Sequence, residues 1–526
     1  MTPPPAVVAA ERPNALEHLA ERSNRWLESH RRLYLFLASI LSLLTFSGYA
    51  HAKVPWMDEV VVLTIARLKS VPQIWAALMD AVQTDPPTLQ VLAHYLFRIF
   101  GEHMFLARLP AIVGFTLMCA SLALLLWRHT PPLFAAAAFF LPYATVLRVW
   151  SMDARPYGLM LGFSALSLLC WDGFGDLDSR HRGGWRIAYT VSLAVTFSTH
   201  FYSILLLGPL AAGELCRWIL RRKVDWWMPV CTALALIPYA IWLPILRSGM
   251  HIFGKYHGGL SFQTFYDFYS FAIASMPMAA LLFALAAAAM LAGRIRLETA
   301  PWSVLADRPR ALLAAALGFL ALPAVGYTAG LLVTGFFTPY YHMVAAFGVI
   351  VGLPLALAAI TGRSRTVGLC LLLAIGAQGL FVTARGLSGF RRRDKGYPRA
   401  AEMRALIPEP HPDIVISSPA QFMPFHEAWR GDGADSLVFF FDRQKGREDA
   451  GSDTSDILYQ QLRRYTDARI LPYTEYAAAH RRFYLAVDPG STTGDDWRFR
   501  YLMKTRASLT WLGRADVFDI YRVGLP

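Results

Sequence analysis

Long uncharged segments recur along this chain and constrain its fold more than any other feature. The first, residues 33–50, reads LYLFLASILSLLTFSGYA and contains no charged residue. A helix needs about 20 apolar residues to cross the hydrocarbon core of a bilayer. Such segments predict about eleven transmembrane helices, near residues 33–50, 107–127, 132–147, 157–171, 187–200, 202–220, 228–246, 272–292, 311–335, 340–360 and 367–383. The sequence therefore predicts a polytopic α-helical membrane protein.

The charge composition supports this class and argues against a nucleic-acid partner. Charged residues make up 17% of the chain, whereas soluble domains average about 25%. The net charge of +13 would suggest nucleic-acid binding in a soluble protein. Here many arginines lie in short loops between spans, which is the positive-inside bias of membrane proteins. We therefore expect no nucleic-acid partner.

The distribution of these arginines predicts the topology. Residues 1–32 are polar and precede a full-length span rather than the shorter apolar core of a signal peptide, so we expect an uncleaved cytoplasmic segment. The arginine-bearing loops then alternate with loops that are poor in cations, which favours an odd number of spans and an outer C-terminus. Two outer segments are long, residues 51–106 and 247–271. The first contains helical patterns at 58–69 and 88–100.

The last part of the chain changes character. From residue 385 the sequence becomes rich in charged residues, proline and glycine. Short runs of β-branched and aromatic residues predict strands at 413–417, 436–441, 482–487 and 516–522. We therefore expect a transmembrane domain over residues 33–384 and an extracytoplasmic α/β domain over residues 385–526.

Acidic and basic residues gather at the predicted outer face. Asp58 and Glu59 follow the first span, and a very short second outer loop contains Arg148, Asp153 and Arg155. A carboxylate can act as a general base on a hydroxyl group, and arginine matches the oxygens of a phosphate. A second acid can hold a divalent cation. The spacing leaves a simpler alternative open, in which Asp153 and Arg155 only pair with each other.

Three stretches of the sequence carry a resemblance to a known family. They are Asp58-Glu59 after the first span, residues 85–111 with DPPTL, HYLFRIFGE and FLARLPA, and residues 152–159, MDARPYGL. In order and spacing they resemble the polyprenyl-phosphate-sugar-dependent membrane glycosyltransferases of the GT-C class. In particular they resemble the bacterial protein O-mannosyltransferases and the lipid A aminoarabinose transferase. The resemblance is specific mainly over residues 56–160.

The resemblance implies a role for several residues. Asp58 would be the catalytic base and Glu59 would support it. Asp153 would bind a metal or the donor phosphate, and Asp85 would line the same cavity. Three basic residues would contact the phosphate: Arg155, Arg108 and Lys53. The implied reaction is an inverting displacement at the anomeric carbon, with polyprenyl phosphate leaving.

Other candidate site residues are chosen by their position, or because the sequence departs from the family pattern there. His200, in the outer THFY sequence, is similar to a His-aromatic pair of the family, although an interfacial histidine is usually a hydrogen-bonded anchor. Lys255 is a candidate phosphate ligand, and His257 could join Asp153 on a divalent metal. The family often has an Arg-Tyr pair where this chain reads TPYYH at 338–342, so Tyr341 is a substitute phosphate ligand.

We interpret the chain as a multi-pass enzyme of the bacterial inner membrane with a periplasmic active site. The donor would be a polyprenyl-phosphate sugar. The acceptor would be an envelope molecule such as lipid A, a polysaccharide, another glycan or a protein. Two other classes stay open, a transporter or flippase of lipid-linked glycans and a non-catalytic envelope scaffold. Neither of these needs a carboxylate base.

Overall fold

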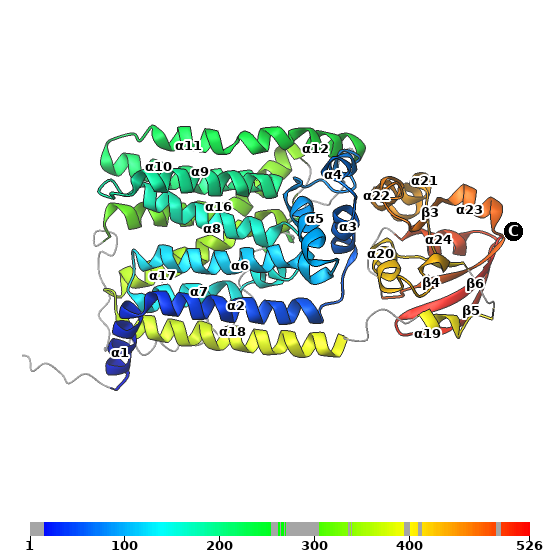
Figure 1. Ribbon diagram of the computed structural model, residues 1–526, viewed down its shortest axis with the longest axis horizontal. Coiled ribbons are helices and arrows are strands. Elements are labelled where there is room, and N and C mark those ends of the chain that lie inside the picture. Colours follow the sequence, from blue (N-terminus) through cyan, green and yellow to red (C-terminus); the bar gives the residue numbers. More distant parts are fainter. Residues whose placement is uncertain are drawn as a thin grey trace, which may run out of the picture.

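The computed structural model consists of a long helical bundle with a small α/β domain at one end (Figure 1). The described residues are 15–253, 261–263, 265–267, 269, 305–334, 337, 339–393, 400–408, 413–490 and 496–526. Eight helices within these residues are long and apolar enough to cross a membrane. The chain is therefore a multi-pass helical membrane protein, as the sequence predicts.

Helices lie at all the predicted spans except 272–292, which is outside the described residues. They are α2 (Arg31–Ala52), α6 (Met104–Trp127), α7 (Pro132–Phe140), α8 (Tyr157–Phe174), α9 (Arg182–Thr199), α10 (Leu207–Arg221), α11 (Trp227–Ala235), α12 (Ile237–Phe253), α16 (Asp307–Ala329), α17 (Ala346–Ile360) and α18 (Arg365–Arg393). How many of these helices cross the membrane stays a prediction, because several are shorter than a full span. His200 has an extended backbone (φ −156°, ψ 136°), which separates α9 from the following helices.

Glycines allow α6 and α8 to pack closely at the centre of the bundle. A Cβ atom on Gly114 of α6 would lie 2.3 Å from the carbonyl oxygen of Gly158 on α8. A Cβ atom on Gly162 would lie 2.3 Å from the carbonyl oxygen of Gly114. Small residues are the usual means by which membrane helices bring their backbones together. This contact fixes the start of α8, which follows the short loop of Asp153 and Arg155.

We expect Gly114→Ala to destabilise the bundle, because the added methyl group would overlap the backbone of α8. Overpacking of this kind costs about 1–3 kcal/mol. Thermal unfolding of the detergent-solubilised protein measures the effect. Gly376→Ala on α18 is the matched control, because no atom lies within 4 Å of the place that its added Cβ atom would take. Equal unfolding temperatures for the two variants would contradict the close packing.

Three short helices lie between the bundle and the α/β domain (Figure 1). They are α3 (Met57–Ala66), α4 (Val71–Met79) and α5 (Thr88–Phe100). Two were predicted from the first outer segment, and α4 was not. Every residue of α3 from Glu59 to Ala66 is buried. A helix that is apolar nearly all round must be covered on all sides, and α3 is covered by the bundle and the α/β domain together.

The α/β domain contains a six-stranded mixed sheet with the order β3-β2-β1-β4-β6-β5. The strands are β1 (Ile414–Ile416), β2 (Leu437–Phe441), β3 (Arg469–Pro472), β4 (Arg482–Val487), β5 (Ser508–Ala515) and β6 (Phe518–Gly524). The first four are parallel, and β6 and β5 are antiparallel. Helices α19 (Ala400–Arg404), α20 (Pro419–Ala428), α22 (Thr454–Leu462), α23 (Tyr473–Ala479) and α24 (Trp497–Lys504) accompany the sheet. The structure confirms the four predicted strands and adds β3 and β5.

The two domains share one apolar core and a set of ion pairs. Val60, Val61 and Ile65 of α3 belong to the same buried cluster as Phe422 and Phe425 of α20. Polar contacts complete the interface: Arg67 with Glu427 (Nη1–Oε2 2.6 Å and Nη2–Oε1 2.5 Å), Arg430 with Glu102 (2.8 Å) and Arg464 with Asp80 (2.9 Å). Arg67 also contacts Glu102 on its own side of the interface. The α/β domain therefore holds α3 from the side opposite the bundle.

Candidate active site

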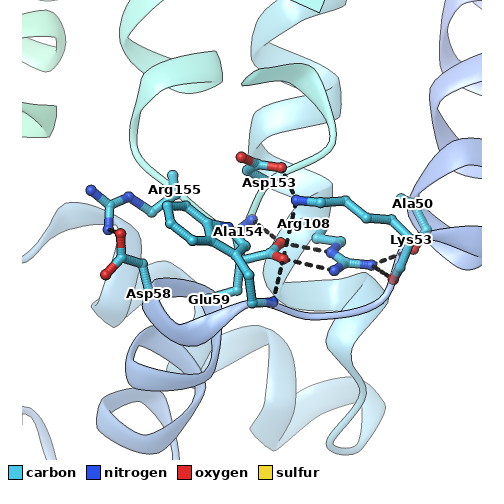
Figure 2. A network of polar contacts seen from close by, with 9 residues as sticks. Ala50, Lys53, Asp58, Glu59, Arg108, Asp153, Ala154 and Arg155 are labelled. Carbon is cyan, nitrogen blue, oxygen red and sulfur yellow. Dashed lines mark hydrogen bonds and ion pairs between the residues drawn. The ribbon is translucent and has the colours of Figure 1, made fainter. Parts of the chain in front are cut away.

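A buried ion pair lies where α3 begins (Figure 2). The Glu59 side chain has no exposed surface and receives two hydrogen bonds from Arg108 of α6, Nε–Oε1 2.8 Å and Nη2–Oε2 2.8 Å. The backbone N–H of Ala154 donates to the same carboxylate at 2.8 Å. Arg108 also donates to the carbonyl oxygens of Ala50 (2.5 Å) and Lys53 (2.8 Å). These contacts join α2, α3, α6 and the loop before α8.

The local sequence explains why the pair forms here. Pro55 and the extended Trp56 (φ −116°, ψ 170°) end the linker from α2. Asp58 and Glu59 then lie in the first turn of α3, where the positive end of the helix dipole favours carboxylates. Glu59 also accepts a long hydrogen bond, 3.4 Å, from the backbone N–H of Trp56. Glu59 therefore fixes the orientation of this turn and, with it, of Asp58.

Lys53 lies between two carboxylates. Its Nζ atom is 3.2 Å from Oε2 of Glu59 and also contacts the carboxylate of Asp153 (Figure 2). Burial raises the pKa of Asp153, and the nearby Glu59 charge raises it further, against the attraction of Lys53. An ammonium group thus takes the place at which a divalent cation would contact both acids. The described residues around Asp153 therefore do not fit a bound metal.

Asp58 and Arg155 form a second, more accessible pair. Oδ2 of Asp58 lies 2.6 Å from Nη1 of Arg155, and the Asp58 side chain is 32% exposed. Arg155 also donates to the hydroxyl of Tyr157 at 3.1 Å, and its guanidinium lies over the Tyr157 ring at 5.3 Å and the Trp56 ring at 5.8 Å. The alternative pairing of Asp153 with Arg155 is not what the structure shows, since Asp153 contacts Lys53 instead.

A third group of side chains continues from Tyr157. Nε2 of His200 lies 3.4 Å from Oδ1 of Asp85, and Nδ1 of His200 accepts a hydrogen bond from the backbone N–H of Tyr202 at 3.1 Å. Burial lowers the pKa of His200, although Asp85 opposes the shift. The neutral imidazole therefore carries its proton on Nε2, facing Asp85. Tyr341 joins this group, because its ring stacks on Tyr202 with centroids 3.9 Å apart.

The structure thus brings most of the predicted residues together. Asp58, Arg155, Lys53, Asp153 and their neighbours lie at one end of the bundle. Arg108 differs from the expectation, because it is only 1% exposed and its guanidinium contacts Glu59 and two carbonyl oxygens rather than an open surface. The predicted ligands Lys255 and His257 lie outside the described residues. Within the described ranges, no group of three or more metal-ligating side chains is present.

Two aromatic residues of the site were not predicted as site residues. Tyr157 contacts both Arg155 and His200, with a ring distance of 5.2 Å to the histidine. Tyr202 stacks on Tyr341. The position of Tyr157 two residues after Arg155, at the start of α8, was a usable signal. No signal in the sequence indicated Tyr202, apart from its place near His200.

The buried pair of Glu59 and Arg108 predicts that the protein loses stability in acid. Burial alone would raise the pKa of Glu59, but hydrogen bonds and charge from Arg108 and Lys53 outweigh it and lower the pKa below the ordinary value of 4.5. A carboxylate with a lowered folded-state pKa contributes stability above its unfolded pKa, and that stability is lost as the pH falls through the folded value. We therefore expect Glu59→Gln to unfold at a lower temperature than wild type near about pH 7, with the difference shrinking below about pH 4.5. A constant difference across this range would contradict the lowered pKa.

Comparison with solved structures identifies the architecture. The crystal structure of ArnT from Cupriavidus metallidurans bound to undecaprenyl phosphate aligns with 93% of this chain and 98% of that chain, at TM-score 0.58 and 14% identity. The apo structure of the same protein aligns with 94% of this chain and 98% of that chain, at TM-score 0.53 and 13% identity. This chain has the GT-C fold. No family model and no curated protein matches the sequence.

The shared fold extends over more than nine tenths of the chain. Because both alignments cover nearly all of each partner, the α/β domain belongs to the shared architecture together with the bundle. The GT-C resemblance predicted from residues 56–160 is therefore confirmed at the level of fold. At 14% identity the likeness concerns the fold alone, and activity has to be argued from the side chains.

Proposed function

We propose that this protein is an integral membrane glycosyltransferase that moves a sugar from a polyprenyl-phosphate donor to an envelope acceptor. The observation that carries the proposal is the pair of Asp58 and Arg155. It combines an accessible carboxylate with a guanidinium whose charge matches a phosphate. The similar ArnT structure contains undecaprenyl phosphate, which supports a lipid phosphate as the partner of this group.

The chemistry follows from the two groups of the pair. An acceptor hydroxyl attacks the anomeric carbon of the sugar while the bond from that carbon to the phosphate oxygen breaks. Asp58 accepts the proton of the hydroxyl, so that no free alkoxide forms. Arg155 stabilises the charge that develops on the departing polyprenyl phosphate. Attack opposite the leaving group inverts the configuration of the anomeric carbon.

In this proposal Arg155 changes partner when the donor binds. In the structure its guanidinium pairs with the Asp58 carboxylate. A donor phosphate competes for the same guanidinium and leaves the Asp58 carboxylate accessible to the acceptor. Tyr157 and Trp56 lie beside Arg155 and limit the positions that the guanidinium can reach.

The remaining residues support this pair. Lys53 is a second phosphate ligand at the same end of the bundle, and Asp153 orients its ammonium group. Glu59 and Arg108 position the first turn of α3 without contacting substrate. Asp85, His200 and Tyr341 form the wall next to Arg155, where a sugar or a phosphate oxygen can accept or donate hydrogen bonds. Lys255 remains a proposed phosphate ligand. The predicted metal shared by Asp153 and His257 is not part of the proposal, because Lys53 already contacts Asp153.

The proposed location follows the arginine distribution. We place the end of the bundle that carries α1 (Ala15–Ser29) in the cytoplasm, because arginines concentrate in the loops at that end. The site and the α/β domain, residues 385–526, then lie on the periplasmic side of a bacterial inner membrane. Residues 33–384 form the transmembrane domain, and residues 1–32 are cytoplasmic.

Release of free polyprenyl phosphate tests the proposal. Purified protein in detergent is incubated with envelope extract and a panel of radiolabelled polyprenyl-phosphate sugars. Release with one donor, together with label in an acceptor, supports the transferase and identifies the sugar. Donor binding without release for every donor would contradict it and would favour a transporter or a non-catalytic scaffold.

A further inference from the structure

A polar cavity lies at the opposite end of the bundle from the candidate active site. Helix α1 crosses this end of the bundle at a steep angle to α2 and α18 (Figure 1). Its residues Ala20 and Leu27 pack against Leu133 of α7 and Leu369 of α18. Beside this contact α1 and the bundle border an open cavity of about 870 Å³. That volume falls in the range of small-molecule binding sites, about 300–1,000 Å³.

The cavity wall carries both signs of charge in equal number. It contains three glutamates and three arginines, namely Glu17, Glu21, Glu28, Arg31, Arg363 and Arg365. Among them, Glu21 forms an ion pair with Arg365. A wall of this composition does not favour a simple anion or a simple cation. It complements a ligand that has both an acidic and a basic group.

Asn24 supplies an unsatisfied polar atom in the same wall. The side chain lines the cavity and is only 3% exposed. Its Oδ1 atom has no hydrogen-bond partner among the described residues. A buried acceptor without a partner is unfavourable, so a ligand that donates a hydrogen bond here is favoured.

The backbone also holds a cation toward this cavity. Arg363 has a left-handed conformation, φ 64°, which is uncommon for a residue other than glycine. Its N–H donates to the Ala358 carbonyl at 2.7 Å, and its Nη1 donates to the His129 carbonyl at 3.2 Å. Arginine so held can present its remaining N–H groups to the oxygens of a phosphate.

The position of the cavity specifies what kind of molecule reaches it. Helices α2, α7 and α18 begin at this level, at Arg31, Pro132 and Arg365, so it is the boundary between the apolar bundle and water. Leu16, Leu19 and Trp26 of α1 are exposed. An amphipathic helix with such a face lies in the headgroup region of a bilayer. Lipid headgroups are therefore the molecules concentrated beside the cavity.

We propose that this cavity binds the headgroup of a zwitterionic aminophospholipid from the adjacent leaflet. The arginines bind the lipid phosphate. The glutamates and Oδ1 of Asn24 accept hydrogen bonds from the primary ammonium group. The acyl chains remain in the bilayer beside α1. The site is separate from the proposed transferase site and does not depend on it.

Lipid binding to the full-length protein tests the proposal. Protein purified in detergent is titrated with dioleoyl phosphatidylethanolamine, phosphatidylcholine or phosphatidylglycerol, and bound lipid is counted by native mass spectrometry. We expect phosphatidylethanolamine to bind about tenfold more tightly than the other two. Phosphatidylcholine cannot donate hydrogen bonds from its quaternary nitrogen, and phosphatidylglycerol has no amine.

Two variants assign the preference to this cavity. Asn24→Leu removes the buried acceptor, and Glu28→Gln removes a charge at an exposed position where misfolding is not expected. Each should reduce the preference for phosphatidylethanolamine. Arg22→Gln is the matched control, because Arg22 is a charged residue of α1 that is not part of the cavity wall.

Three results would overturn the proposal. The first is equal binding of the three lipids by wild type. The second is an unchanged preference in folded Asn24→Leu and Glu28→Gln. The third is binding of free O-phosphoethanolamine as tight as that of the lipid, which would replace a membrane lipid by a soluble ligand.

Discussion

Asp58→Asn is expected to abolish sugar transfer while leaving donor binding nearly intact. The amide has the shape of the carboxylate but cannot accept the proton of the acceptor hydroxyl. Loss of a general base costs about 10²- to 10⁴-fold in turnover. The amide also ends the charge pairing with Arg155, so the guanidinium is free to meet the donor phosphate. Release of polyprenyl phosphate measures turnover, and equilibrium binding of the labelled donor measures affinity.

Asp80→Asn is the matched control for this experiment. Asp80 is a carboxylate of the same segment, residues 51–106, with similar exposure, 34% against 32%. It pairs with Arg464 and not with a residue of the candidate site. An exposed ion pair of this kind contributes about 0–1 kcal/mol, so its activity should stay near wild type. Full turnover by Asp58→Asn would remove Asp58 from the mechanism. Equal loss in both variants would indicate general damage to this segment.

Arg108→Ala is expected to have the largest effect on stability. It leaves the Glu59 carboxylate without its bidentate partner in a site that has no access to solvent. Breaking a buried ion pair from one side costs about 3–5 kcal/mol. Because α2, α3, α6 and the loop before α8 meet at this pair, we expect unfolding at lower temperature and poor recovery from the membrane. Thermal unfolding in detergent and fluorescence size-exclusion chromatography measure both.

A double variant separates the charge from the packing. Arg108→Met combined with Glu59→Met removes both charges, and paired replacement of a buried ion pair by apolar residues is often neutral or stabilising. We expect it to recover stability but not activity, since Asp58 loses its positioning. Arg464→Ala is the control for an exposed arginine, whose side chain is 59% exposed. An Arg108→Ala variant as stable as Arg464→Ala would contradict the proposed role of the pair.

The helical bundle was predictable because length and apolarity alone indicate a membrane span. The elements that escaped prediction lack such signals. Strand β3 has four residues and ends in Pro472, and β5 is irregular between Trp511 and Gly513, with much of its surface exposed. Helix α4 is only nine residues long. Tertiary packing rather than local pattern determines these elements.

The candidate site was predictable as a set of residues but not as a set of contacts. The motifs placed Asp58, Asp153 and Arg155 at one end of the bundle, as the structure shows. They did not indicate which acid meets which cation. Glu59 and Arg108 are 49 residues apart, and Lys53 and Asp153 are 100 apart. Which residues pair across such separations depends on how α2, α6 and α8 cross. A single sequence does not show how helices cross.

The bundle and the α/β domain bury α3 together, and this affects truncations and chimeras of the protein. The helix that carries Asp58 is buried partly by residues of the α/β domain, and Arg67 at its end pairs with Glu427 of that domain. Truncation after the bundle would therefore uncover the apolar side of α3 and leave Arg67 without Glu427, with Glu102 as its remaining carboxylate partner. A chimera that takes its bundle and its α/β domain from different GT-C proteins would have to move α3, α4 and α20 as one module.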